Sequence, residues 1–169
     1  MLSEDMLRHI AEVYIEFRKE KNLSCPTFQQ LMADYKEMSS FGILNLSINK
    51  YRGKELVYHI YLGDEKDKVA ILSKSFSLFR SADVIDKKIY GWANRQLHWF
   101  DMKKLKLFGY LRYDWGGYNI QNDDVRNISI FKKKFGGTET NVYEGTIYRT
   151  TKAKLLRRII EFRRSFNAK

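Results

Sequence analysis

The sequence predicts an α+β fold of three layers, in which a mixed, mainly antiparallel sheet is flanked by helices. Three observations lead to this expectation. The chain opens with two segments in which apolar residues recur at helical spacing, continues with three segments of period two, and then returns to helical and strand-like segments in turn. Its 169 residues are 44% apolar, which is enough for one domain with a complete core. We therefore expect a single domain over residues 1–169.

Two helices are expected at the start of the chain. Residues 4–21 carry apolar positions at helical spacing, namely Leu7, Ile10, Ala11, Tyr14 and Phe17, behind Ser3, which suits a helix amino terminus. Thr27 and Gln30 have the spacing of a capping box. They precede a second apolar face formed by Phe28, Leu31, Met32 and Tyr35.

Three antiparallel strands should follow the helices. Residues 44–48 and 56–62 alternate between apolar and polar and are joined by Arg52-Gly53-Lys54, as in a hairpin, and residues 69–76 add a third strand. The remaining elements are expected at 94–108 (helix, ended by Gly109), 111–115 (strand), 122–135 (helix), 140–149 (strand) and 155–166 (helix). Residues 77–93 are the least regular stretch, and we expect a binding loop there.

The charge of the chain favours an anionic partner. The net charge is +11, which attracts nucleic acid, an acidic membrane surface or a phosphate-bearing small molecule. The last predicted helix carries six basic residues, namely Lys152, Lys154, Arg157, Arg158, Arg163 and Arg164. They either follow a nucleic-acid backbone or form a solvated outer face.

Several classes of protein are disfavoured. Cys25 is the single cysteine, so neither an intrachain disulfide nor a cysteine zinc site is expected, and three scattered histidines suggest no metal site. The first residues lack the apolar segment of a signal peptide, and no window reaches membrane-spanning length. We expect a soluble, cytoplasmic protein.

Four linked segments resemble a bacterial branch of the GNAT (N-acetyltransferase) superfamily, related to the Fem-type peptidoglycan aminoacyltransferases. They are Asn94-Arg95-x-Leu97-His98-Trp99-x-Asp101, Lys106-x-x-Gly109, Tyr113-Asp114-x-Gly116-Gly117 and Phe131-Lys132-x-x-Phe135-Gly136-Gly137. The element order resembles the same fold without its usual first strand. The Gln/Arg-x-x-Gly-x-Gly/Ala phosphate turn of ordinary acetyl-CoA enzymes is not present.

The resemblance implies an acyltransferase. It would move an acyl or aminoacyl group onto an amine of a nucleotide-linked amino sugar or cell-envelope precursor, with either acyl-CoA or aminoacyl-tRNA as donor. A different class stays open, namely a basic module of the same fold that binds tRNA or other nucleic acid without turnover. The chain is also short for the Fem type, so a site completed in a homodimer is a third hypothesis.

Asp114 and His98 are the candidate catalytic residues. Asp114 ends a short strand beside a Gly-Gly break, where the resemblance implies an opening for the acyl arm, and it either accepts the proton of an acceptor amine or forms a turn with Gly116 or Gly117. His98 either serves as a base or is a packed core residue. The same two interpretations, a base or a packed core residue, apply to His59.

The remaining site residues are assigned by role. The donor would meet Ser73, Gly91, Asn94, Arg95 and, by resemblance, Lys132, with Asn94 and Arg95 at a helix start that either binds phosphate or is simply capped. The substrate-binding set is Trp115, Gly116, Gly117 and His59. Trp92, Trp99 and Trp115 either wall an acyl or sugar pocket or pack in the core.

Overall fold

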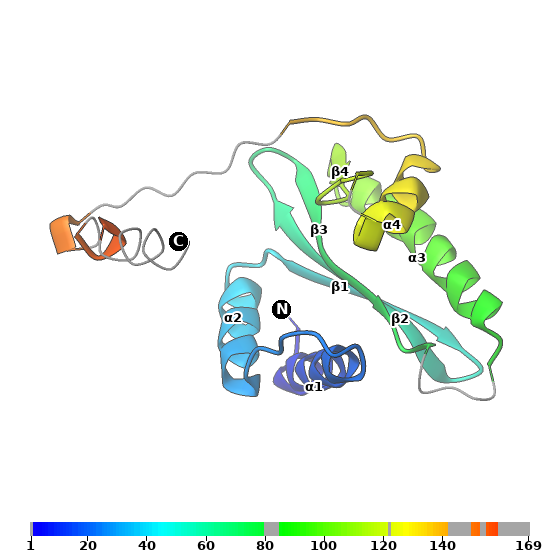
Figure 1. The fold of residues 1–169 in the computed structure, drawn as a ribbon, viewed down its shortest axis with the longest axis horizontal. Coiled ribbons are helices and arrows are strands. Elements are labelled where there is room, and N and C mark those ends of the chain that lie inside the picture. Colours follow the sequence, from blue (N-terminus) through cyan, green and yellow to red (C-terminus); the bar gives the residue numbers. More distant parts are fainter. Residues whose placement is uncertain (1, 80–84, 122, 142–149, 153–154, 159–169) are drawn as a thin grey trace. The chain divides into compact units, whose positions relative to one another are not determined.

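The computed structural model describes residues 2–79, 85–121, 123–141, 150–152 and 155–158, without the side chains of residues 124 and 125 (Figure 1). The chain divides into two compact units, Met1–Ser129 and Ile130–Lys169. The first unit contains the sheet and its covering helices.

The elements occur in the predicted order. They are α1 (Glu4–Glu20), α2 (Phe28–Ser40), β1 (Leu44–Tyr51), β2 (Lys54–Asp64), β3 (Val69–Ser77), α3 (Lys87–Leu107), β4 (Arg112–Asp114) and α4 (Asp123–Lys133). The strand expected at 140–149 falls almost wholly outside the described residues. Of the last predicted helix, residues 155–158 are described and are helical.

Local signals at the helix ends act as the sequence predicts. The Ser3 hydroxyl accepts a hydrogen bond from the Met6 amide at 3.2 Å, and Thr27 and Gln30 form a complete capping box. At the carboxyl end of α3, Gly109 has φ +88°, and its amide donates to the Lys106 carbonyl at 3.0 Å. Such a left-handed residue after the last turn is a common way for a helix to stop.

The sheet has the order β1-β2-β3-β4. β1 pairs antiparallel with β2, β2 pairs antiparallel with β3, and β4 joins β3 in parallel. Helices α1 and α2 lie on one face of the sheet and α3 on the other (Figure 1). The predicted α+β fold of three layers, with a mixed and mainly antiparallel sheet, is confirmed.

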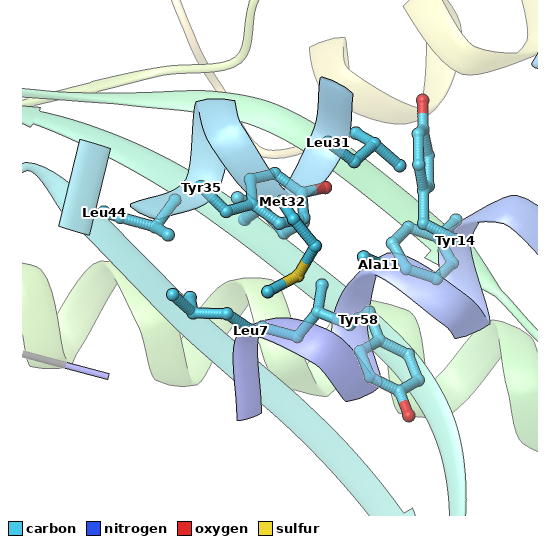
Figure 2. Close-up of a cluster of buried hydrophobic side chains, with 11 residues drawn as sticks. Leu7, Ala11, Tyr14, Leu31, Met32, Tyr35, Leu44 and Tyr58 are labelled. Atoms are coloured by element: carbon cyan, nitrogen blue, oxygen red, sulfur yellow. The ribbon is translucent and has the colours of Figure 1, made fainter. Parts of the chain in front are cut away.

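Separate apolar clusters hold the two helical layers to the sheet. Figure 2 shows the first cluster, in which side chains of α1 (Leu7, Ala11, Tyr14) and α2 (Leu31, Met32, Tyr35) meet Leu44 and Tyr58 of the sheet. On the other face, Val57 packs with Tyr90, Ala93 and Leu97 of α3. Burial of this kind stabilises a layer by about 25 cal/mol per Å² of apolar surface removed from water.

The start of α3 corrects the sequence prediction. The helix was expected from residue 94, after a loop over 77–93, but it begins at Lys87. Asp86 caps it by accepting a hydrogen bond from the Lys88 amide at 2.9 Å, and Tyr90 and Ala93 are buried against the sheet. Tertiary packing of these two side chains overrides the helix-weakening effect of Gly91.

Gly91 offers a test of this extended helix. It lies in the helix interior, and a Cβ atom there would have no neighbour within 4 Å. We expect Gly91→Ala to raise the free energy of unfolding by about 0.5–1 kcal/mol, because alanine loses less backbone entropy on folding. Urea unfolding measures this. Gly63→Ala is the contrasting control, because its Cβ would overlap the Tyr110 hydroxyl, and an unchanged or lower stability of Gly91→Ala would contradict a helix through this position.

A charged cluster beside the first apolar cluster predicts a pH dependence of stability. Glu55 accepts hydrogen bonds from the Tyr58 hydroxyl, from His9 Nε2 at 2.8 Å and from Lys50 Nζ at 3.1 Å. Burial raises the pKa of the Glu55 carboxyl, but the hydrogen bonds from Tyr58, His9 and Lys50 outweigh it and lower the pKa to about 2. A lowered folded-state pKa stabilises the fold above the unfolded value of about 4.5 and loses this contribution as the pH falls toward about 2.

We therefore expect protonation of Glu55 to lower the free energy of unfolding by about 1–2 kcal/mol between pH 4.5 and 2.5. This value includes a reduction for solvent screening, because the His9 side chain is 44% exposed. Urea unfolding of the native protein and of Glu55→Gln over this range measures the contribution as the difference between the two curves. Parallel curves would contradict it.

Candidate functional site

β4 pairs with β3 over three residues only. The paired residues are Val69 with Arg112, Ala70 with Tyr113 and Ile71 with Asp114. Two residues later Gly116 has φ +70°, and a Cβ there would lie 3.4 Å from the Leu72 carbonyl oxygen. A side chain at this position would therefore be strained against β3.

Asp114 forms the turn at which β4 ends. Its Oδ1 accepts a hydrogen bond from the Gly116 amide at 2.7 Å. This is the turn-forming interpretation that the sequence left open. A carboxylate has further acceptor positions, so the turn does not use all of the side chain's hydrogen-bonding capacity.

A β-bulge lies on β3 next to this turn. Ile60 pairs with Lys74 and Tyr61 with Leu72, so Ser73 is the extra residue. The bulge shifts the alternation of the strand, because Ala70 and Leu72 pack on the α3 side whereas, after the bulge, Ser75 contacts Asn94 of that helix. The exposed residue Ser73 is thus next to the point where the pairing of β3 with β4 ends.

The register of β4 separates the two predicted catalytic residues. The Tyr113 hydroxyl is 2.8 Å from Nδ1 of His98 on α3, so Tyr113 projects toward the α3 face. Successive strand residues point to opposite faces, which directs Asp114 to the other face. Asp114 and His98 therefore cannot act on the same atom as a pair.

A buried polar cluster occupies the α3 face of the sheet. His59 of β2 and Asp101 of α3 are 0% and 1% exposed in their side chains, and His59 Nδ1 lies 2.7 Å from Asp101 Oδ2. The other ring nitrogen of His59, Nε2, lies 2.9 Å from Asn94 Oδ1. Both ring nitrogens of His59 therefore have an oxygen atom within hydrogen-bond distance.

Two tyrosines connect this ion pair to His98. The Tyr61 hydroxyl donates to Asp101 Oδ2 at 2.7 Å and lies 2.8 Å from the Tyr113 hydroxyl. Burial raises the pKa of Tyr61, and the nearby Tyr113 and Asp101 raise it further. Burial also raises the pKa of Tyr113. Both phenols therefore keep their protons at neutral pH.

These contacts set the direction of the hydrogen bonds. Because Tyr61 donates to Asp101, the Tyr113 hydroxyl donates to Tyr61 and accepts from His98. The proton of neutral His98 then sits on Nδ1, and Nε2 is its basic nitrogen. The rings of His59 and His98 stack with centroids 4.0 Å apart, and Trp115 lies against His98 at 4.6 Å.

The fold brings together only part of the predicted site. His59, Asn94, His98 and Trp115 meet in the polar cluster, while Ser73 and Gly116 lie where β3 and β4 part. The expectation that Asn94 and Arg95 start the helix is wrong, because both, like Gly91, lie inside α3. Among the others, Gly117 is exposed after the turn, and Lys132 belongs to the unit Ile130–Lys169.

The predicted grouping of tryptophans is also wrong. Trp115 contacts the buried cluster, but Trp92 and Trp99 are 68% and 57% exposed. Neither of these two side chains packs in the core. They lie on the side of α3 that faces away from the sheet.

No site role was predicted for Tyr61, Asp101 and Tyr113, although the last two lie within the motif segments. A signal was present on α3, where Asn94, His98 and Asp101 follow one another at spacings of four and three residues and share a face with Leu97 and Leu105. Polar residues on an apolar helix face indicate a buried polar cluster. Their partners on β2 and β4 could not be identified without the sheet register.

Among the described residues, no group of three or more His, Cys, Asp or Glu side chains is placed to hold a metal ion. None of the described helices combines the length and apolar character needed to cross a membrane.

The fold is similar to those of two solved structures that are described as a probable and a possible acetyltransferase. One, described as a probable acetyltransferase, matches with a TM-score of 0.57 and 8% identity over 89% of this chain and 95% of its own. Another, a possible acetyltransferase from Clostridium difficile 630, matches with a TM-score of 0.60 and 11% identity over 88% of this chain and 95% of its own. The chain therefore has the GNAT-like fold. No protein-family model and no curated protein sequence matches it.

Proposed function

We propose that this protein is an N-acyltransferase that transfers an acyl group from an acyl-CoA donor to an amine. The observation that carries the proposal is the end of β3–β4 pairing after three residue pairs, beside the Ser73 bulge, within a GNAT-like fold. A strand edge that opens next to a bulge offers backbone groups to a ligand.

The opened edge suits the pantetheine arm of the donor. This arm carries two amide groups, which can pair with β3 as an added strand does. Ser73 and Ser75 are small and exposed, and glycine at positions 116 and 117 allows close approach of a ligand to the backbone. Backbone N–H groups of β3 would stabilise the oxyanion that forms on the acyl carbonyl.

The reaction needs a base but no covalent enzyme intermediate. The amine nitrogen attacks the thioester carbonyl, the new C–N bond forms, and the C–S bond breaks to release the CoA thiolate, which takes a proton from solvent. Asp114 accepts the proton that the amine loses. We assign this role to Asp114 because it is only half-buried, next to the proposed acyl arm, whereas His98 is 2% exposed.

The buried cluster positions the strand that carries the base. Tyr113 precedes Asp114 directly, and its hydroxyl is held by Tyr61 and His98. These two hydrogen bonds hold the side chain of Tyr113 and, with it, the short β4. We therefore assign His59, His98 and Asp101 to positioning.

The proposed acceptor and the alternative donor are inferred from the motif resemblance. The Fem-type motifs support an amine on a nucleotide-linked amino sugar or cell-envelope precursor as acceptor. They also support aminoacyl-tRNA as an alternative donor, and the net charge of +11 favours either phosphate-bearing molecule. Non-catalytic tRNA binding is a further outcome of the experiment below, and a site shared in a homodimer is tested separately by concentration-dependent dimerisation.

Calorimetric titration with acetyl-CoA and CoA, beside a labelled tRNA pool at two salt concentrations, tests the proposal. We expect saturable CoA binding that Ser73→Phe abolishes, because the larger side chain fills the opened edge. Ser24→Phe, at an exposed serine between α1 and α2, is the matched control and should bind normally. Salt-sensitive tRNA binding without CoA binding would favour tRNA over acyl-CoA as the ligand. Binding of neither ligand would overturn the proposal for the single chain.

A further inference from the structure

The side of α3 that faces away from the sheet carries large exposed apolar side chains. Trp92, Trp99, Phe100 and Leu107 are 68%, 57%, 56% and 85% exposed. Just beyond the helix, Phe108 and Leu111 are 60% and 83% exposed. We call these six residues the α3 outer face. It extends over about 22 Å from Trp92 to Leu107 at the helical rise of 1.5 Å per residue.

Lysines lie between these apolar residues. α3 contains Lys87, Lys88, Lys103, Lys104 and Lys106, and its single acidic residue is Asp101. Asp101 is 1% exposed and faces the sheet, so the exposed side of the helix carries no acidic side chain. The lysines and aromatic rings contact one another, since Lys103 Nζ lies 5.0 Å from the centroid of Trp99 and Lys104 Nζ 5.7 Å from that of Phe108.

The combination of charge and apolar exposure selects the partner. We propose that the α3 outer face binds the surface of an anionic lipid bilayer. Tryptophan and phenylalanine side chains are favourable at the headgroup level, while lysines around them attract acidic lipids. Each lysine held near such a surface raises partitioning about fivefold.

Other partners fit these residues less well. A second copy of the chain docked face to face would bring the lysines of both α3 helices together, which opposes association. Nucleic acid would use the lysines and stack on the tryptophans. However, Leu107 and Leu111, the most exposed apolar side chains of the face, have no favourable role on a phosphate backbone.

The packing of α3 on the sheet allows only peripheral binding to the bilayer. The opposite side of α3 is buried against β1 and β2 through Tyr90, Ala93 and Leu97, so only the outer half of the helix can enter the headgroup layer. The β2–β3 turn borders Leu111, whose amide donates to the Lys68 carbonyl at 2.8 Å. This turn adds Lys66 and Lys68 but also Asp64, Glu65 and Asp67, so the attraction to acidic lipid comes from α3.

Vesicle sedimentation of the full chain tests the inference without any enzymatic assay. We expect the protein to sediment with vesicles of phosphatidylcholine and phosphatidylglycerol but not with phosphatidylcholine alone, and to be released by high salt. Leu107→Ser with Leu111→Ser should lower partitioning at least tenfold. Lys103→Glu with Lys106→Glu should do the same.

Matched controls lie elsewhere on the first unit. Phe41→Ser removes an apolar side chain that is 70% exposed at the end of α2, and Lys19→Glu with Lys54→Glu reverses two exposed lysines of α1 and β2. Both should keep partitioning within about twofold.

Four results would overturn the inference. The first two are no sedimentation with either vesicle and equal losses of partitioning in the control variants. The other two apply if lipid binding is absent: tRNA binding that depends on the same residues, or concentration-dependent dimerisation that Leu107→Ser with Leu111→Ser abolishes. Because the assay measures lipid binding alone, its result is independent of whether the protein transfers an acyl group.

Discussion

Asp114→Asn should lower the turnover number for acyl transfer by about a hundredfold or more while leaving the fold intact. The asparagine side chain retains an oxygen that can accept the Gly116 amide, as Asp114 Oδ1 does at 2.7 Å. The turn that ends β4 is therefore kept, and the substitution removes only the negative charge and the proton-accepting ability. The release of CoA thiol in the presence of an acceptor amine found by screening measures turnover.

A second aspartate in the same unit provides the control. Asp64 Oδ1 accepts hydrogen bonds from the Lys66 and Asp67 amides, each at 3.0 Å, so it also forms a turn, but away from the opened strand edge. Asp64→Asn should leave turnover unchanged. Near-normal turnover of Asp114→Asn would remove Asp114 as the base.

Asp101→Ala should lower the free energy of unfolding by about 3–5 kcal/mol. Asp101 Oδ2 accepts hydrogen bonds from His59 at 2.7 Å and from Tyr61 at 2.7 Å. Removing the carboxylate leaves both donors buried without this acceptor, and a buried group that loses its partner costs more than the hydrogen bond itself contributes. Urea unfolding followed by circular dichroism measures the loss.

Two further variants separate the ion pair from general disruption of the core. Asp67→Ala, at an exposed position of the β2–β3 turn, should change stability by less than about 0.5 kcal/mol. His59→Leu combined with Asp101→Leu replaces both partners by apolar side chains and should be more stable than Asp101→Ala alone, because no buried imidazole is then left without its acceptor. A loss below about 1 kcal/mol in Asp101→Ala would show that the buried pair is not an important source of stability.

The sequence predicted the order of the elements well because the responsible forces are local. Periodic apolar positions define the faces of α1 and α2, and Ser3 and the Thr27–Gln30 capping box act within three residues of one another. The predicted strand over 111–115 differs from β4 by one residue at each end. The start of α3 was misplaced because the burial of Tyr90 and Ala93 depends on β2, which is distant in the sequence.

The candidate site is formed by contacts between residues that are far apart in the sequence, and local patterns do not predict such contacts. His59 and Asp101 are 42 residues apart, and Tyr61 and Tyr113 are 52 apart. Histidines, tyrosines and the carboxylate were all visible in the sequence. Their meeting required α3 to pack across β2, and the bulge at Ser73 required the pairing of β2 with β3.

The α+β class, the succession of helices and strands through α4 and the caps of α1 and α2 were predictable from the sequence, because propensity, periodicity and short-range hydrogen bonds act between near neighbours. That Tyr113 points into the polar cluster and Asp114 to the opposite face depends on long-range packing. The alternation of side chains along β4 was predictable. Which of its two faces α3 covers is set by the packing of the whole sheet.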